Sequence, residues 1–142
     1  MLGASPATVR ALLAQVGGRL LAMDTTAARG VVVPDQVTHV PRASDVLLGL
    51  IAVRGGIVPL IDLAALLDSG TTEPTGLQVI LLEGDGQEFA FPVHEVLGFH
   101  ALPLPPITGE LTLATTLPDG RTVEYLDVRA TAQALASRVA LQ

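Results

Sequence analysis

The sequence predicts an all-β protein built from two similar units, each of which can curl into a small barrel and ends in a short helix. Three observations support this prediction. Apolar residues alternate with polar ones at the period of a strand, short glycine-containing turns separate the apolar runs, and the order of hairpins recurs about 65 residues along the chain.

The first unit opens with a predicted hairpin, TVRALLAQV and RLLAM joined by Gly17-Gly18, because both positions of a two-residue turn need positive φ. A helix from Pro6 to Val16 with Ser5 as N-cap is the alternative that periodicity leaves open. A valine-rich segment, AARGVVV, follows this hairpin. The second hairpin, GLIAVRGGIVPLIDL, is expected to turn at Gly55-Gly56.

The second unit repeats this layout with less ambiguity, which favours strands over the helix in the first. LQVILLEGDGQEFAFPV predicts strand, turn and strand, VHEVLGF follows, and GELTLATTLPDGRTVEYLDV turns at Asp119-Gly120. Each second hairpin ends in an aspartate, Asp62 or Asp127, that is placed to cap an Ala- and Leu-rich helix. We therefore expect one domain over residues 1–142, with halves at roughly 8–68 and 76–142.

Composition excludes several classes of function. The net charge is −6 and aromatic residues make up 3%, so nucleic acid is an unlikely partner. The chain has no cysteine, no apolar run near the roughly 20 residues of a membrane span, and no signal-peptide pattern. Hydrophobic residues make up 49%, which predicts exposed apolar patches for contact with other proteins, a large core or an obligate oligomer.

Candidate catalytic groups are weak. His39, His94 and His100 lack metal-ligand spacing, and no cofactor motif is present. The segment LLDSGTT matches the aspartic-protease pattern around Asp68, but a second aspartate would have to come from an identical subunit. Asp68 also follows a helix-like stretch, whereas that chemistry places the aspartate at the end of a strand. A homodimeric hydrolase therefore remains a minor alternative.

Arg54 is the informative charge, because it stands in an otherwise apolar hairpin immediately before Gly55. It is either a strand-end residue paired with Asp62 or water, or a polar anchor beside an apolar surface, since arginine is favoured in interfaces. Position alone leaves both interpretations open.

At this hairpin the chain resembles the CheW family of chemotaxis adaptor domains. The signature G-[VI]-x-N-L-R-G-x-[VI]-x-P-[VI]-[VI]-D-L matches in order at Gly49, Arg54, Gly55, Pro59 and Asp62-Leu63. The segments DQVTHVP, EFAFPVHEVLG and DGRTVEYLDV resemble further family elements, so the likeness runs from about Thr8 to the end. Departures occur at Gly30, Ala52 and His94, where the family pattern has Glu, Asn and Asp.

The resemblance implies two five-stranded, SH3-like β-barrels packed together and a non-catalytic, cytoplasmic adaptor without a cofactor, recruited to membrane-associated receptor arrays without inserting into the membrane. It implies two partners, the regulatory domain of a CheA-type histidine kinase and the cytoplasmic tips of chemoreceptors. A barrel end would bind the kinase, and the groove between the barrels would take receptor helices. An orphan domain that binds a small ligand between the barrels is a further alternative.

The interface is expected to use or be framed by nine residues on two segments: Ala28, Arg29, Gly30, Val31, Val32, Gly49, Val53, Arg54 and Gly55. Turn or cap roles are expected for Gly56, Pro59, Asp62 and Asp127, and Gly49 and Gly55 are also explained by architecture.

Overall fold

The computed structural model describes residues 8–41, 45–67 and 78–139. The first half forms β1 (Thr8–Val16), β2 (Arg19–Asp24), β3 (Ala28–Val32), β4 (Leu47–Val53), β5 (Gly56–Ile61) and the one-turn helix α1 (Leu63–Leu66). The second half forms β6 (Gln78–Gly84), β7 (Gln87–Val93), β8 (Glu95–Pro103), β9 (Thr112–Thr116), β10 (Thr122–Leu126) and α2 (Val128–Val139). The all-β prediction is confirmed, and the alternative of a helix ending at Val16 is wrong, because Thr8–Val16 is a strand.

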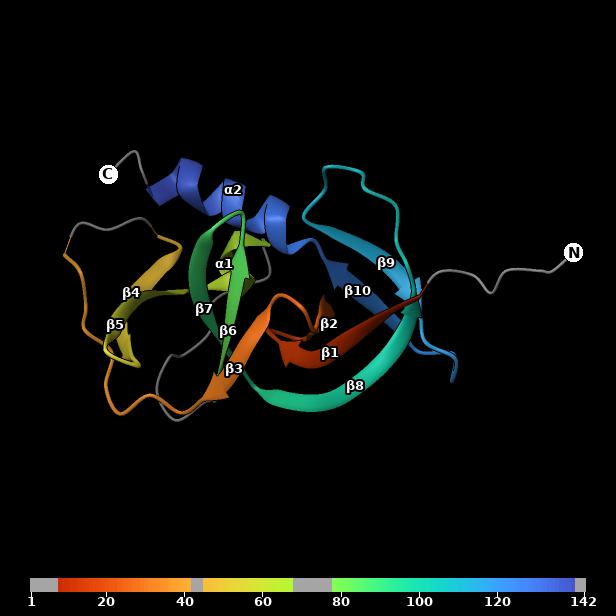
Figure 1. Ribbon diagram of the computed structural model, residues 1–142, viewed down its shortest axis with the longest axis horizontal. Coiled ribbons are helices and arrows are strands. Elements are labelled where there is room, and N and C mark those ends of the chain that lie inside the picture. Colours follow the sequence, from red (N-terminus) through yellow and green to blue (C-terminus); the bar gives the residue numbers. More distant parts are fainter. Residues whose placement is uncertain (1–7, 42–44, 68–77, 140–142) are drawn as a thin grey trace, which may run out of the picture.

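The ten strands form two five-stranded sheets that lie side by side, with α2 running along one side of the molecule (Figure 1). Sheet A has the order β8-β1-β2-β10-β9, and sheet B has the order β3-β6-β7-β5-β4. Each sheet therefore combines the first hairpin of one half with three strands of the other half: β1 and β2 lie in sheet A with β8, β9 and β10, and β6 and β7 lie in sheet B with β3, β4 and β5. The expectation that each half forms its own barrel is corrected by this interleaving.

The burial of the first hairpins gives the physical reason. β1 is apolar on both faces, so both faces must be covered. It pairs with β8 and β2 in the interior of sheet A, where one face packs on the core of sheet A and the other on the core between the sheets. The side chain of Leu13 packs in the core of sheet A, while that of its neighbour Leu12 packs in the core between the sheets. β6 follows the same rule in sheet B, with Leu81 inside the sheet and Leu82 between the sheets.

The fold consequently has three apolar cores rather than two. One fills the concave side of sheet A, one fills the concave side of sheet B, and the largest lies between the sheets and under both helices. The expected strand number is confirmed, but closed barrels are not seen. Within the described residues, no strand pairing joins the edge strands β8 and β9 of sheet A or β3 and β4 of sheet B.

The internal repeat is visible in matching backbone bonds. The Asp62 N–H donates to Val46 O at 2.7 Å, and 65 residues later the Asp127 N–H donates to Leu111 O at 2.9 Å. Each aspartate also accepts a helix N–H at 3.0 Å on its Oδ1, from Ala65 or from Ala130. Both carboxylates therefore satisfy a helix N–H that would otherwise lack a partner.

Hairpin turns follow the prediction at Gly17-Gly18 but not in the second hairpin. Arg54 and Gly55 occupy the two turn positions, with φ of 51° and 79°, and Val53 pairs with Gly56. Gly56 is thus the first residue of β5, and the predicted turn at Gly55-Gly56 is wrong by one residue. The observed register pairs Ile51 with Val58, and both residues lie in the core of sheet B. The turn position follows from the pairing of the whole strands, which two adjacent glycines do not specify.

In the part of the chain that the structure describes, no helix is long and apolar enough to cross a bilayer.

Candidate protein-interaction surface

The two segments predicted to form an interface lie on the two edge regions of sheet B, and the structure brings them together. β3 is one edge strand, and the β4–β5 hairpin forms the opposite side of the curled sheet. Arg54 Nη2 donates across the gap to the carbonyl oxygen of Arg29 at 3.4 Å. The side chain of Arg54 therefore spans two edges that backbone pairing leaves apart.

Gly30 lies beside this arginine, and its backbone conformation favours glycine, with a φ of 148°. A Cβ added at Gly30 would lie at ordinary contact distances, 3.5 Å from Arg54 Nη2 and 3.9 Å from Leu81 Cδ1. The pairing of β3 with β6 shifts register between Ala28 and Gly30, which leaves Arg29 as the extra residue of a bulge. Arg29 points outward and forms an ion pair with Glu83 at 3.1 Å.

Gly49 has a purely architectural position. It is buried, its φ is 157°, and a Cβ there would lie 2.6 Å from both Thr38 O and Val37 Cγ1. The segment around Thr38 can approach β4 closely because position 49 has no side chain, and Leu50 exchanges two backbone hydrogen bonds with Thr38. Gly49 thus frames the surface and cannot itself contact a partner.

The other predicted residues divide between the two faces of the sheet. Arg29, Val31, Arg54 and Gly55 are exposed, whereas Val32 and Val53 pack partly buried against the core of sheet B. Ala28 packs partly buried against the core between the sheets. Pro59 lies opposite Leu50 within the hairpin, where it is half-buried.

The structure adds exposed apolar residues that the sequence analysis did not select. Val33 is 66% exposed and Ile57 is 67% exposed, against 40% for Val31. Alternation in β5 is the signal that could have identified Ile57, since Val58 and Leu60 take the buried face. A hollow of about 410 Å³ lies beside the hairpin, lined by Pro34, Asp35, Gln36, Thr38, Leu50, Ile51, Ala52 and Ile57.

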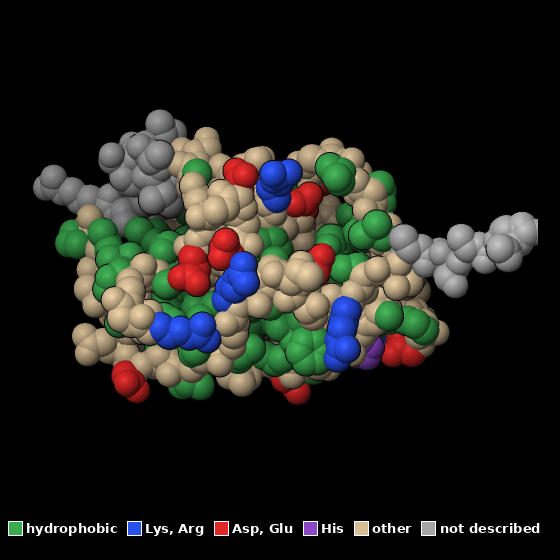
Figure 2. Space-filling model, in the orientation of Figure 1, with side chains coloured by type: hydrophobic (Ala, Val, Ile, Leu, Met, Phe, Trp, Pro, Cys, Tyr) green, Lys and Arg blue, Asp and Glu red, His purple; other side chains and the backbone are tan. Residues whose placement is uncertain are grey.

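Figure 2 shows the side of the molecule that carries β3 and β8: hydrophobic side chains are spread over it, and charged side chains of both signs lie among them. On β8, the side chain of Phe99 is 55% exposed. The guanidinium carbon of Arg10, on β1, lies over the Phe99 ring at 5.0 Å from the ring centroid. Exposed aliphatic and aromatic groups with isolated arginines match the composition of protein interfaces.

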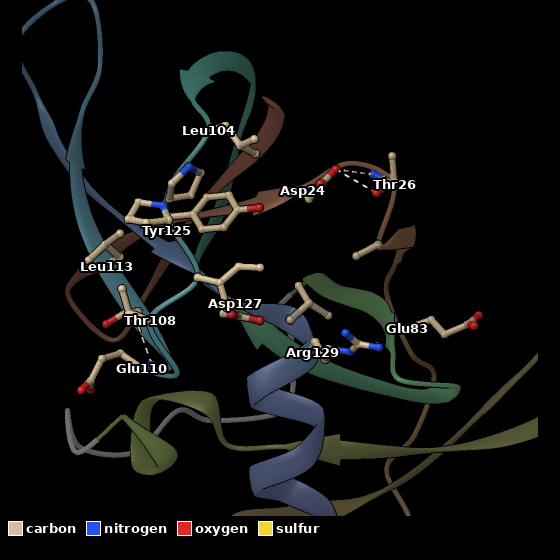
Figure 3. Close-up of a pocket in the computed structure, with 17 residues that line it drawn as sticks. Asp24, Thr26, Glu83, Leu104, Thr108, Glu110, Leu113, Tyr125, Asp127 and Arg129 are labelled. Atoms are coloured by element: carbon tan, nitrogen blue, oxygen red, sulfur yellow. Dashed lines mark hydrogen bonds between the residues drawn. The ribbon is translucent and has the colours of Figure 1, made fainter. Parts of the chain in front are cut away.

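A second hollow lies where the two sheets meet, on the side of α2 (Figure 3). It has a volume of about 360 Å³ and takes its lining from sheet A, from the end of β6 and from the first turn of α2. The loop before β9 forms an apolar lip, because Leu104 is 57% exposed and Ile107 is 94% exposed. The sequence predicted a groove between two barrels but did not identify these residues.

Carboxylates give this second hollow a negative potential. Its lining includes Asp24, Glu83, Glu110 and Asp127, and Figure 3 shows the Tyr125 hydroxyl directed toward the side where Asp24 lies. Burial raises the pKa of Tyr125 above its ordinary value, and the charges of Asp24 and Asp127 raise it further. Asp24 itself is held by the backbone N–H and hydroxyl of Thr26, both at 2.9 Å.

The structure gives no support for a catalytic or metal site among the residues it describes. No group of three or more His, Asp or Glu side chains in that part of the chain is arranged to hold a metal ion. Asp68, on which the protease-like alternative depends, lies outside the described residues.

Comparison with known proteins agrees with the fold. Residues 10–136 match the model of the CheW-like domain family. The chain is 27% identical over 122 residues to the chemotaxis protein CheW of Thermotoga maritima, covering 80% of this chain and 81% of that protein. The crystal structure of a scaffolding CheW protein from Thermoanaerobacter tengcongensis superposes with a TM-score of 0.70 at 20% identity, covering 91% of this chain and 90% of that one.

The family model covers nearly the whole of the described chain, and the structural match extends over both sheets. The hairpin signature, the repeated order of elements and the fold therefore lead to one conclusion: the chain belongs to the CheW-like domain family.

Proposed function

We propose that this chain is a non-catalytic adaptor that couples chemoreceptors to a CheA-type histidine kinase in a chemotaxis-like pathway. The observation that carries this proposal is the match of residues 10–136 to the CheW-like domain family. A relative named as a chemotaxis protein and a structural neighbour named as a scaffolding protein support the same role.

The adaptor role needs two binding surfaces and no reaction centre. The surface formed by β3 and the β4–β5 hairpin is our candidate for the kinase regulatory domain, because it combines an exposed arginine with exposed aliphatic side chains. The boundary between the two sheets is our candidate for receptor helices, because a helix can lay an apolar face into such a depression. We place the protein in the cytoplasm, at the receptor tips.

Physically, such an adaptor acts by raising effective concentration. A protein that binds receptor and kinase at separate surfaces converts the encounter of the two partners into an event within one complex. The receptor can then change kinase activity without any covalent step on the adaptor. This mechanism requires both surfaces to be occupied at the same time. Because the two surfaces are separate, blocking one of them should leave binding at the other intact.

The test is a co-sedimentation assay with three purified components. Vesicles carrying the receptor are mixed with the kinase, with and without this chain, and the sedimented kinase is measured. We expect the chain to increase the sedimented kinase, and Arg54→Ala to reduce that increase while the variant keeps its melting temperature. Arg121→Ala is the matched control, since Arg121 is an exposed arginine beside the β9–β10 turn and pairs with Asp119 at 2.9 Å.

Two outcomes would count against the proposal in different ways. If the wild-type chain binds neither vesicles nor kinase, the adaptor function is wrong and family membership describes the fold alone. If Arg54→Ala loses thermal stability in proportion to binding, the arginine supports the fold and the kinase surface lies elsewhere.

A further inference from the structure

We propose that Arg54 recognises a carboxylate side chain of the protein partner, which enters the space above Gly30. The inference rests on the proposed function, since it names the chemistry of the partner at the β3 and β4–β5 surface. It is carried by the bonding of Arg54, by the empty space at Gly30, by the backbone conformation of Arg54 and by the apolar residues around it.

The guanidinium of Arg54 has almost no bonding to the described residues. It makes one hydrogen bond among them, to Arg29 O at 3.4 Å, which is long for a charged donor. No carboxylate of the described residues lies within ion-pair distance of it. Four other arginines of that part of the chain do have such a partner, namely Arg19, Arg29, Arg121 and Arg129.

The space next to this guanidinium is shaped for an incoming group. Gly30 has no side chain, and a Cβ added there would have two neighbouring side-chain atoms within 4 Å, Arg54 Nη2 at 3.5 Å and Leu81 Cδ1 at 3.9 Å. A carboxylate that accepts hydrogen bonds from Nη1 and Nη2 of an arginine lies with its oxygens about 2.8 Å from those nitrogens. The absence of a side chain at position 30 leaves access for such an oxygen.

The backbone of Arg54 shows that the fold does not favour this residue. Its φ of 51° lies in the left-handed region, where the other two-residue turns carry Gly17 or Asp85. Glycine, asparagine and aspartate adopt this conformation at a lower cost than arginine. Arg54 is unfavourable for the turn and makes almost no bonds to the described residues. We therefore infer that its side chain serves binding to another protein.

The surroundings point to a protein segment rather than a small acid. Val31 and Ile57 are exposed on either side of the turn region, and the hollow of about 410 Å³ begins at Ala52 and Ile57. Ala52 precedes Arg54 by two residues, a span of about 7 Å along a strand. A partner that places an apolar side chain in the hollow and an Asp or Glu at Arg54 would satisfy both features and exclude water from the ion pair.

The first experiment measures affinity and stability together. The kinase regulatory domain and a receptor-tip fragment are titrated calorimetrically with wild type, Arg54→Asn and Arg54→Lys at low and high salt. We expect Arg54→Asn to weaken binding of the kinase regulatory domain about 10- to 100-fold and to leave binding of the receptor-tip fragment unchanged, while its melting temperature stays equal or rises, since asparagine suits the turn. Arg54→Lys should bind with intermediate affinity, because it keeps the charge but loses the paired donors.

The second experiment tests whether the missing group is a carboxylate. Gly30→Glu and Gly30→Gln carry the same backbone strain and nearly the same shape, but only Glu offers Arg54 an acidic partner within the chain. We expect Gly30→Glu to bind the partner more weakly than Gly30→Gln. Arg54→Glu should lose binding, and one member of a panel of partner variants, each with a surface Asp or Glu changed to Arg, should restore it.

The outcomes separate this inference from the proposed function. If the kinase regulatory domain binds wild type but binds Arg54→Asn equally well, or if no variant of that domain restores Arg54→Glu, the carboxylate assignment is wrong and the adaptor role stands. If neither partner binds wild type, the proposed function fails and this inference fails with it.

Discussion

At some positions of this chain, glycine is required because there is no space for a side chain. Gly49 is the clearest case, because an added Cβ would lie 2.6 Å from the carbonyl oxygen of Thr38, an atom of the backbone that cannot rotate away. The family signature includes this glycine, and the structure supplies the physical reason for it: the close approach of the segment around Thr38 to β4.

We expect Gly49→Ala to destabilise the fold by more than about 2 kcal/mol, since backbone strain and a steric clash act together. Gly18→Ala is the matched control, because Gly18 also has positive φ but no atom within 4 Å of its added Cβ. Denaturant unfolding of both variants gives the comparison. Equal losses of stability would show that φ alone explains the cost and that the approach of Thr38 is unimportant.

Tyr125 gives the molecule a pH dependence that can be measured directly. Burial, followed by the charges of Asp24 and Asp127, raises the pKa of its phenol above 10.0, so the folded state favours the neutral form. Above pH 10 the unfolded chain therefore loses this proton before the folded chain does, and stability falls as pH rises.

The chain has one tyrosine, so its ultraviolet absorbance titration reports Tyr125 alone. We expect the midpoint of tyrosinate formation to be higher in the folded chain than in urea. Tyr125→Phe should lose less stability than wild type between pH 9 and pH 11. A folded midpoint at or below that in urea would contradict the assigned environment.

At the level of elements, α2 depends on the strand end beneath it. Val128, Ala132 and Leu135 point into the core between the sheets, and the first turn of the helix rests on Gly84 at the end of β6. A Cβ at Gly84 would lie 2.8 Å from Val128 O, so glycine is needed there for contact and not for backbone conformation.

We expect Gly84→Ala to shift α2 away from sheet B and to cost about 1–3 kcal/mol, as overpacking of a core contact does. Gly56→Ala is a matched strand glycine whose Cβ would meet Val53 O at an ordinary 3.6 Å, and it should be neutral or slightly stabilising. Hydrogen exchange of the α2 amides locates the effect. Unchanged protection of α2 in Gly84→Ala would argue against this contact.

At the scale of the whole molecule, the interleaved strands join the two halves of the sequence into one folding unit. Sheet B needs β6 and β7 between β3 and β5, and sheet A needs β1 and β2 between β8 and β10. Neither half carries a complete sheet, so an isolated half exposes the apolar faces that the other half would cover.

We therefore expect fragments 1–72 and 73–142 to show no cooperative unfolding when studied alone and to recover a native circular dichroism spectrum when mixed. A linker-extended chain with extra residues inserted after position 72 is the control, and it should unfold cooperatively. A cooperative melt from either fragment alone would show that the half is a domain in its own right.

The sequence by itself determined most strands and both helices of this protein, but it did not determine which strands pair with one another. Periodicity and turn chemistry predicted the hairpins, the repeat of about 65 residues and the capping positions Asp62 and Asp127, because these depend on neighbours within a few residues. The family resemblance predicted two segments that form or frame an interface, and the Arg54 contact to Arg29 brings these segments together; their role in binding stays a prediction.

Tertiary structure alone decided three further matters. It exchanged the first hairpins between the sheets, since a strand that is apolar on both faces must be covered on both faces, and the interior of each sheet lies between two apolar cores. It placed the turn at Arg54-Gly55 rather than at Gly55-Gly56, because the position of a turn follows from the register of the whole strand pair, in which Val53 pairs with Gly56, and not from the glycines alone. It also left Val33 and Ile57 exposed beside Arg54, and exposure depends on what the rest of the chain covers, which local sequence cannot specify.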